Sequence, residues 1–245
     1  MKKQQFLNTY VNNVTMEETI NEIKESINKN KKIYIVAVNV DVIVKIESDK
    51  ELKNVVDNAD MVLIDGKPLI WISKIKKKPI KEKISGSDLV PKLCKVANEK
   101  GYSIFILGGK DGIANQAKLK LEEKYKNIKI IGTYAPPIGF ENDEKELKKI
   151  NTMINKGKPD LLFVCLGCPK QEKWIAKNID KYNAKVSICA GATVDFLAGN
   201  VKRAPKWMSN CGLEWFFRFL QEPKRLFKRY FIDDIKIIKL MKKYK

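Results

Sequence analysis

The clearest signal of the fold is the stretch Leu161-Leu-Phe-Val-Cys-Leu-Gly-Cys-Pro-Lys-Gln-Glu172. Its first six residues, 161–166, are all apolar. A short run without alternating polar residues is typical of a parallel strand that is buried on both faces. Gly167 and Pro169 then mark a turn, and an amphipathic segment follows at 170–180. The stretch therefore predicts a strand that leads directly into a helix.

The same alternation of apolar runs and amphipathic segments recurs along the chain. The remaining strand candidates are 33–38, 61–64, 103–107, 129–131 and 185–190. The helical candidates are 16–28, 41–58, 88–100, 112–126, 144–155 and 170–180. Strands that alternate with helices in this way form right-handed βαβ units. We therefore expect an α/β fold with a doubly wound, mostly parallel Rossmann-like sheet.

Composition excludes several kinds of chemistry. The chain has 245 residues, of which 44% are hydrophobic, and this is enough for a sizeable core. It contains no His, which excludes catalytic triads built on His and metal sites with His ligands. If the protein is an enzyme, its general base must therefore be Asp, Glu, Lys, Tyr or Cys.

Signals for export are also missing. No apolar run reaches the roughly 18–20 residues of a membrane span, and the basic N-terminus lacks the apolar region of a signal peptide. The five Cys show no framework spacing, so we interpret them as reduced thiols in the cytoplasm. The spacing of Cys165 and Cys168 also fits a redox pair. Because the pair ends a strand instead of opening a helix, where a lowered thiol pKa is expected, we favour packing for both.

Polar and Gly-rich residues follow the predicted strands. Doubly wound sheets bind ligands beyond the carboxyl ends of their strands, so these residues are the first candidates for a site. They are Asn39 and Asp41, Asp65 and Gly66, Gly108 and Gly109, residues 167–172, and residues 191–195. Glycine permits close approach of a ligand to the backbone, and helix N-termini favour anions. We expect these segments to converge on one crevice.

Each candidate also has a purely structural interpretation. Asp65 is either a general base at the crevice or half of an ordinary turn. Asp195 is a ligand contact or a helix cap, and Gln171 is a ligand contact or a first-turn residue. The Gly108-Gly109 turn either holds a diphosphate at a helix N-terminus or only links a strand to a helix.

Three motifs of nucleotide-dependent enzymes are absent. Neither GxGxxG nor Gly-x4-Gly-Lys-Ser/Thr occurs, which disfavours a nicotinamide-type oxidoreductase and a P-loop enzyme. No Asp-x-Asp triplet occurs, although many sugar-nucleotide transferases use this pair to hold a divalent metal. We therefore expect no metal and no cofactor, and we expect Arg and Lys to neutralise the charge of a leaving group.

The last 45 residues differ from the rest of the chain. Residues 201–245 contain 13 Lys and Arg against 4 Asp and Glu, a net charge of 13 − 4 = +9, and no strand-like run. We expect an α/β core at 1–200, followed by a C-terminal basic helical appendage of two amphipathic helices at 201–245. Trp215 and Phe216 near Arg218 favour contact with an anionic membrane surface. A solvated face and nucleic-acid binding are the alternatives, but no nucleic-acid module is visible.

Several ordered motifs resemble the WecG/TagA/CpsF family of bacterial glycosyltransferases (glycosyltransferase family 26). The motifs, spread over nearly the whole chain, include Leu63-Ile-Asp-Gly66, Pro169-Lys-Gln-Glu172, Arg203-Ala-Pro205, Gly212-Leu-Glu-Trp215 and Glu222-Pro-Lys-Arg225. The resemblance implies an inverting, metal-independent transferase. Its donor would be a UDP-sugar, typically carrying N-acetylmannosamine, and its acceptor N-acetylglucosamine on a polyprenyl diphosphate. The product would belong to wall teichoic acid or a related surface glycan, made at the inner face of the cell membrane.

The resemblance also implies roles for individual residues. Asp65 matches the proposed base of the family. The nucleotide-sugar pocket of the family matches Asn39, Gln171 and Asp195. Asp41, Gly108 and Gly109 are further binding candidates at the strand ends. The cations that would neutralise the diphosphate are Arg218, Arg225 and either Arg229 or Lys228.

Three positions depart from the family pattern. Ala37 stands where Thr is usual, so a hydroxyl is lost and the identity of the donor sugar stays open. Lys83 replaces the usual Arg and remains cationic. Phe140 follows an altered segment, Pro136-Pro-Ile-Gly139, and is a candidate for stacking on the uracil. Another UDP-hexose donor and a non-catalytic sugar-nucleotide or lipid-binding protein of the same fold are the alternatives, and the sequence leaves a homo-oligomer open.

Overall fold

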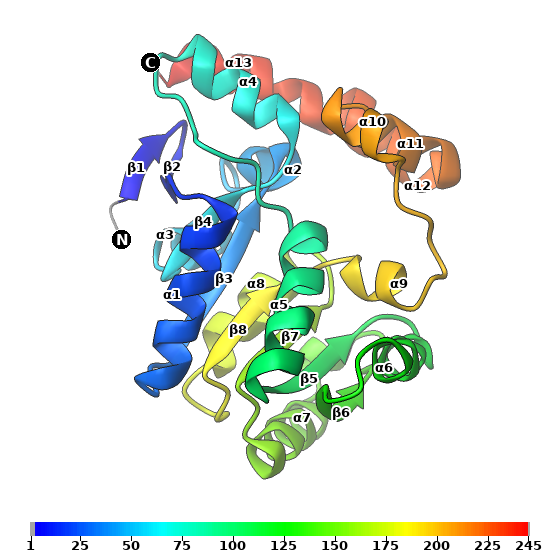
Figure 1. The fold of residues 1–245 in the computed structure, drawn as a ribbon. Coiled ribbons are helices and arrows are strands. Elements are labelled where there is room, and N and C mark those ends of the chain that lie inside the picture. Colours follow the sequence, from blue (N-terminus) through cyan, green and yellow to red (C-terminus); the bar gives the residue numbers. More distant parts are fainter. Residues whose placement is uncertain (1–2, 245) are drawn as a thin grey trace.

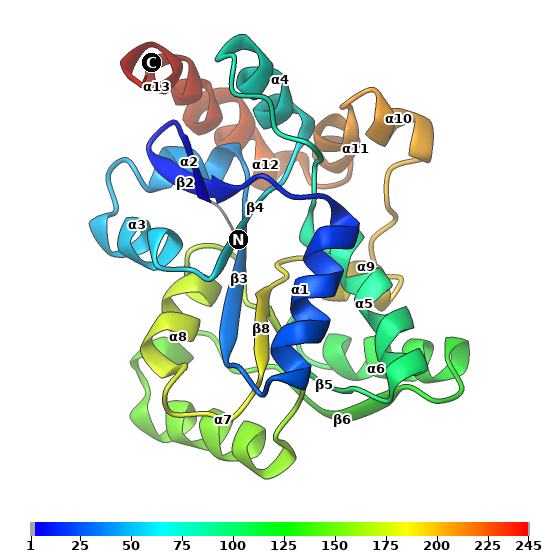
Figure 2. The same cartoon turned by 60° about the vertical axis from the view of Figure 1, so that its left-hand side comes forward.

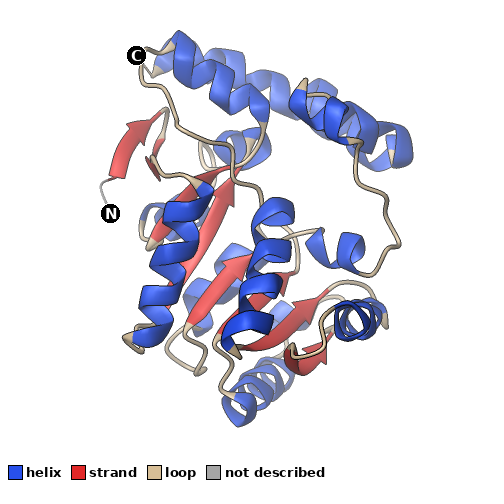
Figure 3. Cartoon of the chain, in the orientation of Figure 1, coloured by secondary structure: helices blue, strands red, loops and turns tan. Residues whose placement is uncertain are grey.

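The computed structural model describes residues 3–244 and contains a six-stranded parallel sheet with helices on both faces (Figure 1, Figure 3). The strand order is β4-β3-β8-β7-β5-β6, and all neighbouring strands run parallel. The strands are β3 (Ile33–Val38), β4 (Met61–Ile64), β5 (Ser103–Gly108), β6 (Lys129–Tyr134), β7 (Leu161–Cys165) and β8 (Val186–Cys189). This architecture confirms the prediction of a doubly wound α/β fold, and all six strands lie where the apolar runs predicted them.

The uninterrupted apolar runs follow from burial on both faces of the sheet. Successive side chains of a strand point to opposite faces. In β7, Leu162 and Val164 join the hydrophobic core on one face, whereas Leu161 and Phe163 join the core on the other. Because helices cover both faces, neither set of side chains can be polar.

The helices form two layers. One layer contains α1 (Met16–Asn28), α5 (Gly86–Lys100), α6 (Ile113–Lys124) and α9 (Thr193–Leu197). The other contains α3 (Lys50–Asp57), α7 (Glu144–Gly157) and α8 (Lys170–Asn178), with the short η1 (Phe140–Asn142) before α7. In Figure 1, α1, α5 and α6 lie in front of the sheet, and α7 and α8 lie behind it.

The prediction of one helix over 41–58 was wrong. Two helices, α2 (Val40–Lys45) and α3, occupy this segment. Asn39 caps α2, where its side chain accepts a hydrogen bond from the Val42 N–H at 3.1 Å. Asp49 caps α3 in the same way, accepting from the Leu52 N–H at 2.9 Å. The second cap starts a new helix because its side chain replaces the helical partner of a first-turn N–H.

A β-hairpin and two helices of the core, α4 (Lys67–Ile75) and the five-residue α9, were not predicted from the sequence. The strands β1 (Lys3–Phe6) and β2 (Thr9–Asn12) pair antiparallel, and the Asn12 side-chain oxygen accepts from the Val62 N–H of β4 at 2.8 Å. The helix α4 follows β4. These elements are short, and the hairpin turns at Leu7, whose φ of +49° is unusual for a residue other than glycine or asparagine.

The appendage, residues 201–245, is helical but contains more than the two helices expected. Its elements are α10 (Lys206–Asn210), α11 (Glu214–Gln221), α12 (Pro223–Lys228), the π-helix η2 (Arg229–Asp233), η3 (Asp234–Lys236) and α13 (Ile237–Lys243). Pro223 ends α11 and opens α12, because proline fits the first turn of a helix but not its interior.

The appendage folds back across the carboxyl ends of the strands. Figure 1 and Figure 2 both show α13 beside α4, and the Lys76 side chain donates a hydrogen bond to the Met241 carbonyl. Lys243 pairs with Glu47 at 2.7 Å, and the side chain of Leu240 is buried. These contacts dock the appendage on the core. No helix within residues 3–244 is long and apolar enough to cross a membrane.

Candidate functional site

Two neighbouring cavities lie at the carboxyl ends of the strands. The first, the strand-end cavity, has a volume of about 430 Å³ and is lined by the segments after β3, β7 and β8 together with α11 and α12. The second, the appendage cavity, has a volume of about 370 Å³ and lies between the start of α4 and helices α11 to α13. Both are lined by Asn39, Asp65, Ser87, Arg218 and Arg229.

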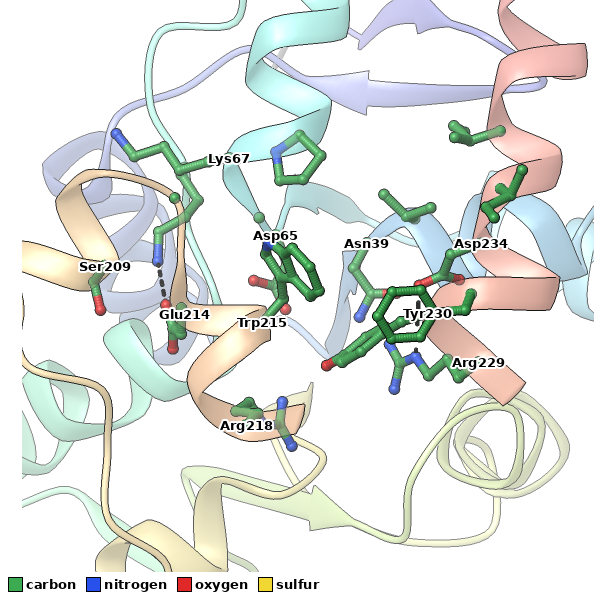
Figure 4. Close-up of a pocket in the computed structure, with 18 of the residues that line it drawn as sticks. Asn39, Asp65, Lys67, Ser209, Glu214, Trp215, Arg218, Arg229, Tyr230 and Asp234 are labelled. Carbon is green, nitrogen blue, oxygen red and sulfur yellow. Dashed lines mark ion pairs between the residues drawn. The ribbon is translucent and has the colours of Figure 1, made fainter. Parts of the chain in front are cut away.

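Asp65 stands where the two cavities meet, directly after β4. Its N–H donates to the Val38 carbonyl at 2.8 Å, which continues the β3–β4 ladder by one residue. Gly66 follows with a φ of +103°, a conformation that glycine adopts at no steric cost. The chain therefore turns sharply into α4, and Asp65 lines both cavities. Figure 4 shows its side chain in the appendage cavity.

The surroundings of Asp65 raise the pKa of its carboxyl group to about 6. Burial is the largest cause, because it disfavours the charged form. Lys83 and Arg218 act in the opposite direction, whereas Glu214 and Asp88 raise the pKa further. A carboxyl group with a pKa near neutrality holds a proton better than an ordinary aspartate and is still mostly ionised at pH 7, which suits a general base.

Gln171 ties together two loops of the strand-end cavity. Its side-chain oxygen accepts from the N–H groups of Gly167 and Gly191, at 3.3 and 3.0 Å. Its amide group donates to Glu172 at 2.7 Å. Both side chains are buried, and both line the cavity. Gln171 therefore holds the loops after β7 and β8 in one arrangement.

Asn39 and Asp41 also line the strand-end cavity. The oxygen of the Asn39 side chain is used by its cap on α2, and its amide nitrogen has no hydrogen-bond partner among residues 3–244. Asp41 is buried and pairs with Lys45 at 2.8 Å and with Arg229 at 3.7 Å. Asp41 is thus an anchor for cations of both the core and the appendage.

The appendage brings four cations to the strand-end cavity. They are Arg218, Arg225, Lys228 and Arg229. Arg218 lies over the Phe196 ring at 5.7 Å from its centroid, and Arg225 pairs with Glu222 at 3.0 Å. Lys228 and Arg229 both reach the cavity, so the choice between them that the sequence left open is not exclusive. Four carboxyl groups, those of Asp41, Asp65, Glu172 and Asp233, line the same cavity, so its cations are concentrated on the appendage side, where they can contact an anionic ligand.

Four predicted binding residues lie outside both cavities: Gly108, Gly109, Phe140 and Asp195. A Cβ atom at Gly108 would stand 2.5 Å from the Cys165 carbonyl, so close packing on β7 requires this glycine. Phe140 is 4% exposed and packs in the hydrophobic core. The Asp195 carboxyl is half-buried. Its pKa is raised mainly by burial and, to a smaller extent, by the nearby charge of Glu222. The structure gives Gly108 and Phe140 a packing role, and their predicted ligand contacts stay predictions.

The appendage cavity has mainly apolar walls that sequence reasoning did not foresee. Trp215, Tyr230 and Phe231 line it beside three isoleucines of the appendage. The Trp215 and Tyr230 rings meet edge to face with centroids 5.7 Å apart. Of the two aromatic residues for which membrane contact is predicted, Trp215 lines this cavity, whereas Phe216 is exposed and lines neither cavity, and their contact with lipid stays a prediction. The same cavity also contains Lys83 and Glu214 (Figure 4 labels the latter).

The cysteines are free thiols. Burial raises the pKa of the Cys165 thiol to about 12, and burial also raises the pKa of Cys168. Thiols of this kind are poor nucleophiles at neutral pH, in keeping with the packing interpretation. Among residues 3–244, no three Cys, Asp or Glu side chains are grouped so that they could hold a metal ion.

Comparison of the sequence with known proteins shows which proteins this chain is similar to. The family model described as "Glycosyl transferase WecG/TagA/CpsF family" matches residues 4–245. A Bacillus subtilis (strain 168) protein is 35% identical over 177 residues, which cover 72% of this chain and 67% of the relative. A Bacillus spizizenii (strain W23) protein is 30% identical over 81% of this chain and 75% of the relative. A Staphylococcus aureus (strain MRSA252) protein is 28% identical over 87% and 83%. All three relatives are named N-acetylglucosaminyldiphosphoundecaprenol N-acetyl-beta-D-mannosaminyltransferase.

Proposed function

The chain belongs to the WecG/TagA/CpsF family of glycosyltransferases, and from this premise we propose that it transfers N-acetylmannosamine from a UDP-sugar to N-acetylglucosamine on a polyprenyl diphosphate. The observation that carries the proposal is the position of Asp65 between a cationic cavity and an apolar one. A base at this junction reaches two substrates that approach from different sides. The product would enter wall teichoic acid or a related surface glycan.

The strand-end cavity suits the donor. The diphosphate of a UDP-sugar needs positive charge, which Arg218, Arg225, Lys228 and Arg229 supply from the appendage. Asn39 offers an amide nitrogen without a hydrogen-bond partner in the described part of the chain, and Gln171 fixes the two loops that form the cavity wall after β7 and β8. Ala37 lines the same cavity and presents a methyl group where a threonine would present a hydroxyl.

The appendage cavity suits the acceptor. Its aromatic and isoleucine walls match a polyprenyl chain, and the polar groups at its inner end, Asp65 and Lys83, match a sugar next to the diphosphate. An acceptor bound in this way places its sugar hydroxyl at the junction with the strand-end cavity. The protein would then work at the inner face of the membrane, where polyprenyl-linked sugars present their head groups.

The proposed reaction is a single displacement with inversion at the anomeric carbon. The acceptor hydroxyl oxygen attacks C1 of the donor sugar, and Asp65 takes the hydroxyl proton as the new C–O bond forms. The bond between C1 and the UDP oxygen breaks, and UDP leaves with the bonding electron pair. The arginines around the strand-end cavity stabilise the charge that develops on UDP, a role that a divalent metal has in other transferases. We propose that this enzyme needs no such metal.

A panel of donors tests the proposed function. Purified protein is incubated with UDP-N-acetylmannosamine, UDP-N-acetylglucosamine or UDP-glucose and a short-chain polyprenyl diphosphate-N-acetylglucosamine, with and without EDTA. Mass spectrometry is expected to show a product one N-acetylhexosamine heavier with the first donor, in equal yield with EDTA. Because Ala37 alters the donor cavity, the other donors test the alternative specificity. Loss of product in EDTA contradicts the metal-independent mechanism, and no product with any donor contradicts transfer to this acceptor.

A membrane surface is the further partner that we propose. The large apolar side chains Phe227 and Ile232 are exposed on the appendage and line neither cavity. Replacing both by serine is expected to weaken binding to anionic vesicles roughly 10²- to 10⁴-fold, because each of the two large apolar side chains contributes about 1.5–3 kcal/mol on burial. Vesicle co-sedimentation measures this loss. Turnover on a short-chain, water-soluble acceptor is expected to persist, because neither residue lines a cavity.

The matched control replaces two exposed apolar residues of the core, Leu119 and Ile138. The Leu119→Ser, Ile138→Ser variant loses similar apolar surface and is expected to bind vesicles like the unchanged protein. Equal loss in both double variants, or no loss in the Phe227→Ser, Ile232→Ser variant, would show that this face of the appendage does not bind the membrane.

A further inference from the structure

Four charged side chains form a closed ring beside the candidate base. Lys83 pairs with Asp88 at 2.6 Å, and Asp88 pairs with Arg203 at 2.6 Å. Arg203 lies 3.7 Å from Glu214, and Glu214 lies 3.6 Å from Lys83, which closes the ring. The charges alternate in sign around it, so each cation faces two anions and each anion faces two cations. Such an arrangement is stronger than isolated surface pairs.

The ring joins the core to the appendage. Lys83 precedes α5 and Asp88 lies in its first turn, whereas Arg203 and Glu214 belong to the appendage. Two further hydrogen bonds hold it in place: Ser85 donates to Asp88 at 2.7 Å, and Arg203 donates to the Ser87 carbonyl at 2.9 Å. The ring can therefore close only when the appendage is docked as Figure 1 shows.

The ring also determines what Lys83 does near Asp65. Both residues line the appendage cavity, and yet no ion pair joins them among residues 3–244. The ammonium group of Lys83 points instead to Asp88 and Glu214, both of which lie closer than 4 Å. A carboxylate in a direct ion pair with lysine is a poor base, because the pair stabilises its charged form.

Resting on the proposed role of Asp65 as the base, we propose that Glu214 is a positioning residue that holds Lys83 off the Asp65 carboxylate. Docking of the appendage then prepares the base for reaction, because it delivers Glu214 together with the arginines of the donor cavity. With the appendage undocked, Lys83 keeps only Asp88 as a partner within the ring and is less restrained from approaching Asp65.

The charges that face Asp65 agree with this assignment. Lys83 and Arg218 lower the pKa of Asp65, whereas Glu214 and Asp88 raise it. Loss of Glu214 removes an anion and leaves Lys83 with Asp88 as its only partner in the ring, and both changes stabilise the charged form of Asp65. The pKa of the base is therefore expected to fall when Glu214 is neutralised.

The test is the pH profile of kcat/KM for the full-length protein and its Glu214→Gln variant, with the short-chain acceptor. The acid limb of this profile reports the pKa of the base in the free enzyme. In the variant, its midpoint is expected to move down by about 0.5–1 pH unit, in line with the removal of one nearby charge. A carbon-13 NMR titration of labelled Asp side chains, assigned with Asp65→Asn, gives the same midpoint without substrates. It keeps the test decisive even if the variant turns over too slowly to measure.

Two controls separate positioning from loosening of the appendage. Arg203→Gln opens the same ring but removes a cation, so its acid limb is not expected to move down. In a Lys83→Met background, Glu214→Gln is expected to produce less than half of its original shift, because the residue it positions is gone. An unchanged midpoint in Glu214→Gln, an equal downward shift in Arg203→Gln, or a full shift without Lys83 overturns the proposal. If Asp65→Asn retains turnover, the proposed function itself is wrong, whichever result Glu214→Gln gives.

Discussion

Replacing Asp65 by asparagine is expected to lower kcat by roughly 10²–10⁴-fold, the usual contribution of a general base. Asparagine has nearly the same shape but cannot accept the proton of the acceptor hydroxyl. The carboxyl group stands between the two cavities, and its raised pKa keeps it ready for proton transfer. Turnover is measured by mass spectrometry of the lipid-linked product, and donor binding by calorimetry.

Binding of the UDP-sugar separates loss of chemistry from loss of structure. Its Kd is expected to change little in Asp65→Asn, because the cations of the donor cavity remain in place. Asp111→Asn, an exposed carboxylate in the loop before α6, is the matched control and is expected to behave like the unchanged protein. An Asp65→Asn enzyme with near-normal kcat would remove Asp65 from the role of base.

The pH dependence gives an independent check on the same group. Since the pKa of Asp65 is raised to about 6, the carboxyl group is protonated below this pH and cannot accept a further proton. The value of kcat/KM is therefore expected to fall about tenfold per pH unit well below pH 6 and to level off above pH 7. A profile that stays flat down to pH 4.5 would assign proton transfer to another group.

Replacing Arg218 by alanine is expected to lower kcat by roughly 10²–10³-fold, as the loss of one charge-stabilising group does in other enzymes. Arg218 is one of two cations that line both cavities, and it lies over the Phe196 ring, which orients its guanidinium group. It can therefore contact the diphosphate of the bound donor and stabilise the negative charge that develops on UDP as it leaves. Initial rates with saturating donor and acceptor measure the effect.

Two matched variants identify what Arg218 contributes. Arg218→Lys keeps the charge but not the planar geometry, and it is expected to recover only part of the rate. Lys224→Ala removes an exposed appendage cation that lines neither cavity, so its rate is expected to stay unchanged. If Arg218→Ala and Lys224→Ala have the same rate, the general charge of the appendage matters and this position does not.

Local patterns were enough to predict the α/β architecture and part of the site. A strand buried on both faces must be apolar throughout, so runs such as residues 161–166 can be recognised as strands from the sequence alone. Asp65, Gln171 and Asn39 follow such strands, and parallel strands bring their carboxyl ends to one edge. The meeting of these three residues at the strand-end cavity thus follows from the order of strands and helices.

Contacts in space and the shortness of some elements explain what the sequence did not show. Gly108 ends β5 and Phe140 follows β6, but both residues pack against neighbours in space. The glycine packs on β7, and the phenylalanine lies in the hydrophobic core. The β1–β2 hairpin has only four residues in each strand, too few for a periodic pattern to stand out. Position after a strand thus indicates a site only where the turn faces open space.

The composition of the appendage can be read from the sequence, but its position in the fold cannot. Its charge and amphipathic character are visible in the sequence, because they depend only on which residues are present and on a period of 3.6. The path of the appendage is not visible in the sequence. The direction of the chain after α9 depends on contacts between residues far apart in sequence, such as Arg203 with Asp88 and Lys243 with Glu47. These long-range contacts turn aromatic side chains inward as cavity walls, carry four cations to the strand ends, and place Glu214 opposite Lys83.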